Sequence, residues 1–149
     1  MSILWSLQLR REAASVPFAR RLLLGAMETA GVDPDICYDL SVALSEACAN
    51  AVEHGGHGAG ATADYQITAY MDGERCRIEV SDSGPGFGEG AARRVVPDPG
   101  AEAESGRGLM LIRKLADHVR VENLPGAGGA VVSFDKLLKW RENAPLTAV

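Results

Sequence analysis

The spacing of apolar residues in this chain switches several times between that of a strand and that of a helix, and the order of the switches limits the folds it can form. Strands place every second residue on one face, and helices repeat a face after about 3.6 residues. The spacing predicts, in chain order, a strand over 3–9, helices over 15–30 and 34–54, strands over 65–71 and 75–81, a helix over 109–116, and strands over 119–121 and 131–134.

Residues that cap or end helices stand at the junctions between these segments. Gly31 follows the first helical segment as a stop, while Asp33 and Pro34 open the second as its N-cap and first turn. Gly55-Gly56 closes the second helix, and Asp72-Gly73 turns the chain between two strands. Local signals therefore support the same element boundaries as the apolar spacing.

The first three elements each have one apolar face that we expect to line the core. These faces are Ile3, Trp5, Leu7 and Leu9 in the strand, Phe18, Leu22, Leu23, Ala26 and Met27 in the first helix, and Ile36, Leu40, Ala43, Leu44, Ala47 and Ala51 in the second. Helices with one apolar face can cover one side of a sheet. The expected fold is therefore α/β (α+β), a two-layer sandwich of a mostly antiparallel mixed sheet with three helices on one face.

The length of 149 residues fits one domain. Hydrophobic residues make up 46% of the chain and charged residues 23%, which is enough apolar material for a core that does not depend on disulfides or a metal. We expect a single domain over residues 1–141 and a flexible tail over residues 142–149.

Charge and cysteine content argue against several classes of protein. The net charge is −5 and no basic run exceeds two residues, so we expect no direct nucleic-acid partner, since such proteins present a positive surface to phosphates. The three cysteines lack CxxC spacing and are expected to be buried, reduced thiols of a cytoplasmic protein. No leader or long apolar span is visible, which argues against secretion and membrane insertion.

The second helix carries polar residues beside its apolar face. Glu46, Asn50 and His54 are spaced i, i+4 and i+8 and so share one side of the helix. A carboxylate and a carboxamide in this relation can present a base and a neutral oxygen ligand to one bound group, and the amide oxygen suits Mg²⁺. A polar helix edge that faces water has the same spacing, so both interpretations stay open.

A glycine-rich loop, Asp82-Ser83-Gly84-Pro85-Gly86-Phe87-Gly88, directly follows the third predicted strand. A buried Asp82 could accept a hydrogen bond from an exocyclic amine and so select adenine. Gly84 and Gly86 would let the backbone approach the ring without a Cβ clash. The same residues also make a common surface turn, which is the alternative interpretation.

Gly106 and Gly108 precede the third predicted helix. The free backbone N–H groups at a helix N-terminus can bind phosphate, and the helix dipole favours the anion. A plain helix start after a loop is the alternative, and the GxxxxGK[ST] pattern of a P-loop is absent. The polar segment 91–105, which contains Pro97 and Pro99, is expected to move.

These motifs, in this order, resemble a known group of ATPases. Glu46-Ala-x-x-Asn50-Ala-x-x-His54-Gly55, Asp82-x-Gly84-x-Gly86-Phe87 and Gly106-Arg107-Gly108-Leu109 are similar to the N, G1 and G2 boxes of the gyrase, chaperone and histidine-kinase ATPase superfamily. The likeness is strongest to its small branch, the anti-sigma-factor serine kinases of bacterial sporulation and stress control. It extends from the first strand to Phe134.

The resemblance implies a Bergerat ATP-binding fold that uses ATP and Mg²⁺, and it suggests roles for single residues. Asn50 resembles the Mg²⁺ ligand, and Glu46 resembles the catalytic residue that accepts the proton of a partner's serine. Asp82 resembles the acceptor for the adenine amine, with Gly84 and Gly86 shaping the base pocket.

The G2 box, Gly106-Arg107-Gly108-Leu109, resembles the turn that binds the phosphates. Within it Arg107 could touch a phosphate or be solvated, and the sequence leaves this open.

The resemblance further implies two protein partners, a sigma factor that the chain captures and an anti-anti-sigma factor that it phosphorylates on serine. It also makes a homodimer plausible. A different class of function, an ATP-gated protein-binding module without kinase activity, is the alternative. The presence of Glu46 favours the kinase, because a module that only binds has no need of a base at that position.

Overall fold

The computed structural model describes residues 1–54, 64–82, 103–123 and 129–142. Its elements, in chain order, are β1 (Ser2–Arg10), α1 (Ser15–Ala30), α2 (Pro34–His54), β2 (Asp64–Met71), β3 (Arg75–Asp82), α4 (Ala103–Leu115), β4 (His118–Asn123) and β5 (Ala130–Leu137). This is the order of strands and helices that the apolar spacing predicts. Within the described ranges, no helix is both long enough and apolar enough to cross a membrane.

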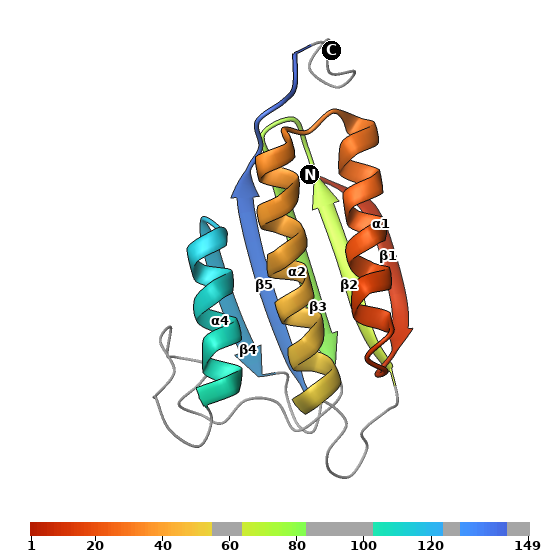
Figure 1. Ribbon diagram of the computed structural model, residues 1–149, viewed down its shortest axis with the longest axis vertical. Coiled ribbons are helices and arrows are strands. Elements are labelled where there is room, and N and C mark those ends of the chain that lie inside the picture. The colour runs from red at the N-terminus through yellow and green to blue at the C-terminus, as the bar shows by residue number, and fades with distance from the viewer. Residues whose placement is uncertain (55–63, 83–102, 124–128, 143–149) are drawn as a thin grey trace.

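The described strands form one sheet in the order β1-β2-β3-β5-β4, and each pairing is antiparallel. The three described helices lie on the same face of this sheet (Figure 1). The predicted two-layer α+β sandwich is therefore confirmed. No parallel pair occurs among the described strands, so the sheet is antiparallel where the sequence led us to expect a mixed one.

The core lies between the two layers, with α2 in the middle of the helix layer (Figure 1). The predicted apolar face of α2 is buried at each position: Ile36, Leu40, Ala43, Leu44, Ala47 and Ala51. Opposite it, the helix-facing residues of β3 are buried as well: Cys76, Ile78 and Val80. Each large apolar side chain buried in this way stabilises the fold by roughly 1.5–3 kcal/mol.

The predicted caps hold the two long helices in place. Gly31 ends α1 with φ at 95°, and its N–H donates to the carbonyl oxygens of Met27 and Glu28. This left-handed conformation is easily reached by glycine. Oδ1 of Asp33 accepts a hydrogen bond of 2.8 Å from the N–H of Asp35, which is the predicted N-cap of α2.

The prediction for Ile3 is wrong, because β1 contains a bulge. Ile3 pairs with Tyr70 of β2 and Trp5 with Ala69, so Leu4 is an extra residue in β1. The bulge returns Trp5 to the helix-facing side but leaves Ile3 on the opposite face, 62% exposed.

The predicted face of α1 is wrong by part of a turn. Ala19, Leu23 and Met27 are fully buried, whereas Phe18 is 43% exposed and Leu22 is 37% exposed. Apolar residues cover so much of this helix that spacing alone allows more than one face. The face of α1 that packs on the sheet carries the small Ala19 in its second turn, which lets the helix approach closely.

The segment after β5 crosses the end of the molecule where α1 meets α2. The N–H of Leu138 donates to the carbonyl oxygen of Glu74 at 2.7 Å, and Nε1 of Trp140 donates to that of Gly73 at 2.9 Å. Further backbone hydrogen bonds of 2.8 Å link residues 139 and 141 to the α1–α2 connection. Of the predicted tail, residues 143–149 lie outside the described residues.

Candidate functional site

The residues singled out by the sequence gather at one end of the sandwich. The last turns of α2, the end of β3 and the first turns of α4 lie at the same end, the lower one in Figure 1. This end is opposite the one crossed by the segment after β5. The described parts of three motifs that are far apart in the sequence therefore lie at the same end of the sandwich.

Asn50 is a buried polar residue on α2. The residue is only 7% exposed, and its amide nitrogen Nδ2 is buried with no hydrogen-bond partner among the described residues. Leaving a buried amide unsatisfied costs about 1–3 kcal/mol. Asn50 is therefore not part of a helix edge that faces water, and its amide nitrogen has a hydrogen bond to offer to a bound group. Glu46, one turn earlier, is partly buried.

Gly108 of α4 lies directly against these two side chains. A Cβ added to Gly108 would lie 3.2 Å from Oε2 of Glu46 and 3.4 Å from Oδ1 of Asn50. Any residue with a side chain would displace one of them. The glycine thus lets α4 approach the polar face of α2, and it brings the first and third motifs into contact.

The start of α4 differs from the prediction. The helix begins at Ala103, so Gly106, Arg107 and Gly108 lie inside it and not in a turn before it. Ala103-Glu104-Ser105 continues the helix ahead of the glycines, and the packing of Gly108 on α2 favours a helical backbone there. The first four N–H groups of a helix have no intrahelical partner. Gly106 is the fourth residue of α4, so its N–H is a possible phosphate donor, whereas that of Gly108 belongs to the helix ladder.

Arg107 and Leu109 occupy different environments. Arg107 is exposed, which fits the solvated alternative, and Leu109 is buried in the core between the layers. Leu109 therefore anchors α4 by packing.

Asp82 is the last residue of β3. Its cross-strand neighbours are Tyr65 and Ala130, both buried, and it is in the same row as the helix-facing residues of the strand. This position faces the site and suits a residue that contacts a base. Gly84 and Gly86 lie outside the described residues, as does the expected moving segment up to residue 102.

The cysteines are buried free thiols, as predicted. Burial raises the pKa of the Cys48 thiol to about 12, and it raises the pKa of Cys76 to about 12 as well. Burial also raises the pKa of Tyr65, whose hydroxyl lies 2.6 Å from that of Ser15. Neutral, enclosed thiols are poor nucleophiles, so these groups belong to the core.

Sequence reasoning missed Lys136 of β5. Its Nζ donates to the carbonyl oxygen of Leu115 at 2.7 Å and lies 3.5 Å from Oδ2 of Asp39. The sequence signal that could have identified this residue is a lysine among the apolar residues of the strand face that packs against the helices.

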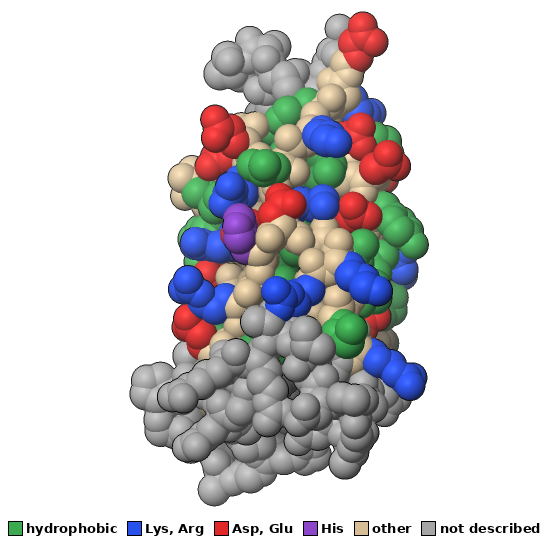
Figure 2. Space-filling view, turned by 90° about the vertical axis from the view of Figure 1, so that its left-hand side faces the viewer, with side chains coloured by type: hydrophobic (Ala, Val, Ile, Leu, Met, Phe, Trp, Pro, Cys, Tyr) green, Lys and Arg blue, Asp and Glu red, His purple; other side chains and the backbone are tan. Residues whose placement is uncertain are grey.

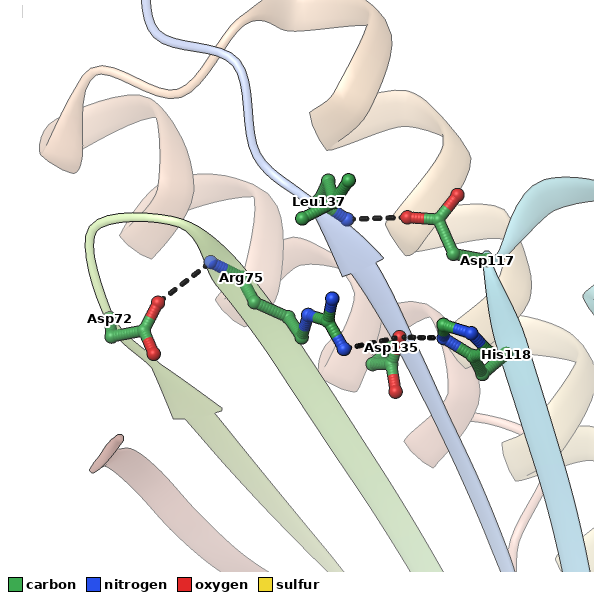
Figure 3. Close-up of polar contacts among 6 residues, drawn as sticks. All are labelled: Asp72, Arg75, Asp117, His118, Asp135 and Leu137. Carbon is green, nitrogen blue, oxygen red and sulfur yellow. Dashed lines mark hydrogen bonds and ion pairs between the residues drawn. The ribbon is translucent and has the colours of Figure 1, made fainter.

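The face of the sheet opposite the helices carries a depression of about 690 Å³, and among the described residues that line it there is no predicted site residue. Its arginines have acidic partners: Arg75 lies 3.7 Å from Asp135, and Arg120 lies 3.5 Å from Glu122. Nδ1 of His118 is 2.9 Å from Oδ1 of Asp135 (Figure 3). Figure 2 shows charges of both signs interspersed on the side of α4 and β4. The sheet face opposite the helices therefore has the character of a solvated surface.

The chemistry of the site fits Mg²⁺ and phosphate. Asn50 and Glu46 offer neutral and anionic oxygens, which hard cations prefer, and the N-terminus of α4 favours an anion. The unsatisfied amide nitrogen of Asn50 can donate to an oxygen of a bound group. The missing Cβ of Gly108 keeps the space beside both side chains free.

The chain is similar to known proteins over most of its length. Residues 9–136 match the family model described as "Histidine kinase-like ATPase domain". The chain is 32% identical over 148 residues to the serine-protein kinase RsbW of Listeria monocytogenes serovar 1/2a, covering 93% of this chain and 92% of that protein. It is 30% identical over 125 residues to the serine-protein kinase RsbW of Bacillus subtilis, covering 80% and 78%.

Solved structures show the same fold. The RsbU and RsbW domains of Rv1364c from Mycobacterium tuberculosis superpose with a TM-score of 0.63 at 22% identity, and the match covers 91% of this chain and 33% of that one. The ATP binding domain of PrrB from the same organism superposes with a TM-score of 0.50 at 23% identity, covering 92% and 98%.

Proposed function

The chain belongs to the histidine kinase-like ATPase domain family and to its branch of RsbW-like serine kinases, and we propose that it uses ATP and Mg²⁺ to phosphorylate a serine on a partner protein. The contact of Gly108 with Glu46 and Asn50 is the observation that carries this proposal. It joins a base, an oxygen ligand and a helix N-terminus at one end of the molecule. Two relatives of similar length are serine-protein kinases by name.

Each residue has a distinct part in the proposed reaction. Asn50 would hold Mg²⁺ through its amide oxygen, and the bound ion would neutralise phosphate charge. Asp82 would accept a hydrogen bond from the adenine amine, and the first N–H groups of α4 would hold phosphate oxygens. In phosphoryl transfer the protein mainly positions groups and stabilises charge, so few residues are needed.

Glu46 is the proposed catalytic residue. Glu46 is partly exposed, and its carboxylate would therefore be within reach of a protein substrate. It would accept the proton of the serine hydroxyl as that oxygen bonds to the γ-phosphorus and ADP leaves.

The resemblance of the three boxes extends the proposal to partners. The protein would act in the cytoplasm as an anti-sigma factor that sequesters a sigma factor and phosphorylates an anti-anti-sigma factor. It would form a homodimer with one nucleotide site in each subunit. Phosphorylation would release the kinase from the antagonist.

A variant at Glu46 distinguishes a serine kinase from an ATP-gated binding module without kinase activity. The protein is incubated with ATP, Mg²⁺ and a partner captured in the presence of ATP, and the partner is then examined by mass spectrometry. We expect phosphoserine with wild type, a loss of at least about 100-fold with Glu46→Gln, and ATP affinity within about threefold of wild type. Capture without phosphoserine would identify the module instead.

A further inference from the structure

Lys136 stands out in the row of β5 that faces the helices. The other members of this row, Ala130, Val132 and Phe134, are buried and apolar. The side chain of Lys136 is only 15% exposed. A charged side chain that is largely buried needs polar partners in the protein.

The partners of Lys136 belong to the two helices that form the site. Its Nζ donates to the carbonyl oxygen of Leu115, the last residue of α4, at 2.7 Å. It also lies 3.5 Å from Oδ2 of Asp39, in the second turn of α2. Lys136 thus joins the sheet, the C-terminus of α4 and the start of α2 at one point.

This point and the site are two turns apart on both helices. Asp39 precedes Glu46 by seven residues on α2, and Gly108 precedes Leu115 by seven on α4. Seven residues bring a helix back to nearly the same side, about 10 Å along its axis. The two helices run in opposite directions (Figure 1). The Lys136 bridge and the Gly108 contact therefore lie on the same α2–α4 interface, one at each end of it.

The end of α4 is attached to the sheet by separate bonds. The N–H of Asp117 donates to the carbonyl oxygen of Asp135 at 2.8 Å. The N–H of Leu137 donates to Oδ2 of Asp117 at 2.6 Å (Figure 3). These bonds hold the end of α4 to β5 but do not reach α2. Loss of the Lys136 side chain would leave α4 on the sheet and free it to pivot relative to α2.

We propose that Lys136 is a positioning residue that fixes α4 against α2 and thereby keeps Gly108 beside Glu46 and Asn50. The placement of α4 by Lys136 does not depend on the proposed function. The consequence for ATP binding does rest on the proposed function. If α4 pivoted at its C-terminal end, its N-terminus would move away from the polar face of α2, where ATP is proposed to bind.

The test uses Lys136→Met, which keeps the length of the side chain and removes its charge, and Lys136→Arg, which keeps the charge. Lys139→Met, at an exposed position three residues later, is the matched control. Asp39→Asn weakens only the contact with α2 and serves as a milder variant if Lys136→Met folds poorly. Hydrogen exchange is measured residue by residue in protein without nucleotide, and ATP affinity is measured by calorimetry with Mg²⁺.

We expect Lys136→Met to speed exchange of the Leu109 and Met110 amides about tenfold and to weaken ATP binding about tenfold, with Asp39→Asn between it and wild type. Lys136→Arg should stay within about threefold of wild type, and Lys139→Met should match it. If hydrogen exchange at these amides is unchanged in both Lys136→Met and Asp39→Asn, the proposal that Lys136 positions α4 is wrong. If exchange is faster but ATP affinity is unchanged, the proposal that this positioning supports ATP binding is wrong. If wild type binds no ATP, the proposed function fails, and the exchange data still decide the placement.

Discussion

The backbone of Gly108 lies so close to Glu46 that a methyl group on Gly108 would stand 3.2 Å from the carboxylate oxygen Oε2. This contact joins residues that are 62 positions apart in the chain. It makes the position of a proposed base depend on the absence of a side chain on the neighbouring helix.

Gly108→Ala is expected to disturb the proposed reaction more than the fold. Its methyl group would push the Glu46 carboxylate by a few tenths of an ångström, so phosphoryl transfer should fall about tenfold. Alanine also favours the helix by up to about 1 kcal/mol, which offsets part of the steric cost. Transfer rates and urea unfolding measure the two effects.

Gly25→Ala is the matched control, because a Cβ at Gly25 in α1 would meet nothing within 4 Å. It should raise the free energy of unfolding by roughly 0.5–1 kcal/mol and leave transfer unchanged. Equal transfer rates in the two variants would contradict the proposed contact between Gly108 and the base.

Asn50→Ala is expected to weaken Mg²⁺-dependent ATP binding at least about tenfold without destabilising the ligand-free protein. The substitution removes an amide whose nitrogen is buried and unsatisfied, and such a group costs about 1–3 kcal/mol. Ser41→Ala is the control, since Ser41 is also buried on α2 but its hydroxyl donates to the carbonyl oxygen of Tyr38 at 2.8 Å. Calorimetry should show wild-type affinity for Ser41→Ala. A loss of stability greater than about 1 kcal/mol in Asn50→Ala would argue that the amide is structural.

Asp82→Asn should reduce the preference for ATP over GTP. An amide can donate as well as accept, so the variant can contact the carbonyl group that guanine carries where adenine carries its amine. We expect a loss of ATP affinity of about tenfold and a smaller loss for GTP, measured by competition with a fluorescent nucleotide. Ser81→Ala, on the opposite face of β3, should leave both affinities unchanged. Parallel losses for the two nucleotides would place Asp82 away from the base.

The free energy of unfolding should fall as the pH rises above 9. Burial raises the pKa of Cys48 from its ordinary 9.0 to about 12, so between these values the folded protein holds a proton that the unfolded chain has released. The contribution is complete below pH 9 and decreases by about 1.4 kcal/mol per pH unit for each such thiol. Urea unfolding at several pH values measures the slope, and Cys48→Ala should make it shallower. An identical slope in the variant would show that this thiol titrates normally in the folded state.

The sequence allowed a prediction of most elements because their boundaries depend on neighbouring residues. Gly31 and Asp33 act within one turn of their own helices, and the apolar face of α2 repeats over many residues. The bulge at Leu4 depends on the register with β2, which β1 alone does not specify. The exposed side of Phe18 depends likewise on how closely α1 meets the sheet.

The same limit applies to the candidate site. The motif residues were identifiable from their spacing, but the position of Gly108 inside α4 depends on a contact with α2. The bridge made by Lys136 joins three elements and has no local pattern beyond a charged residue in an apolar row.

The position of β5 in the sheet has a consequence for how the molecule assembles. β5 follows β4 in the chain but lies between β3 and β4, and β4 pairs with β5 alone among the described strands. During synthesis, β1, β2 and β3 can already pair under α1 and α2, whereas α4 and β4 have no strand to join until residues 130–137 emerge. The pairing of β5 with β3 joins residues 48 to 62 positions apart in the chain, and it forms late because loop closure must precede it. The half of the site on α2 would thus exist before the half on α4, and nascent chains would gain nucleotide affinity only in the final step of folding.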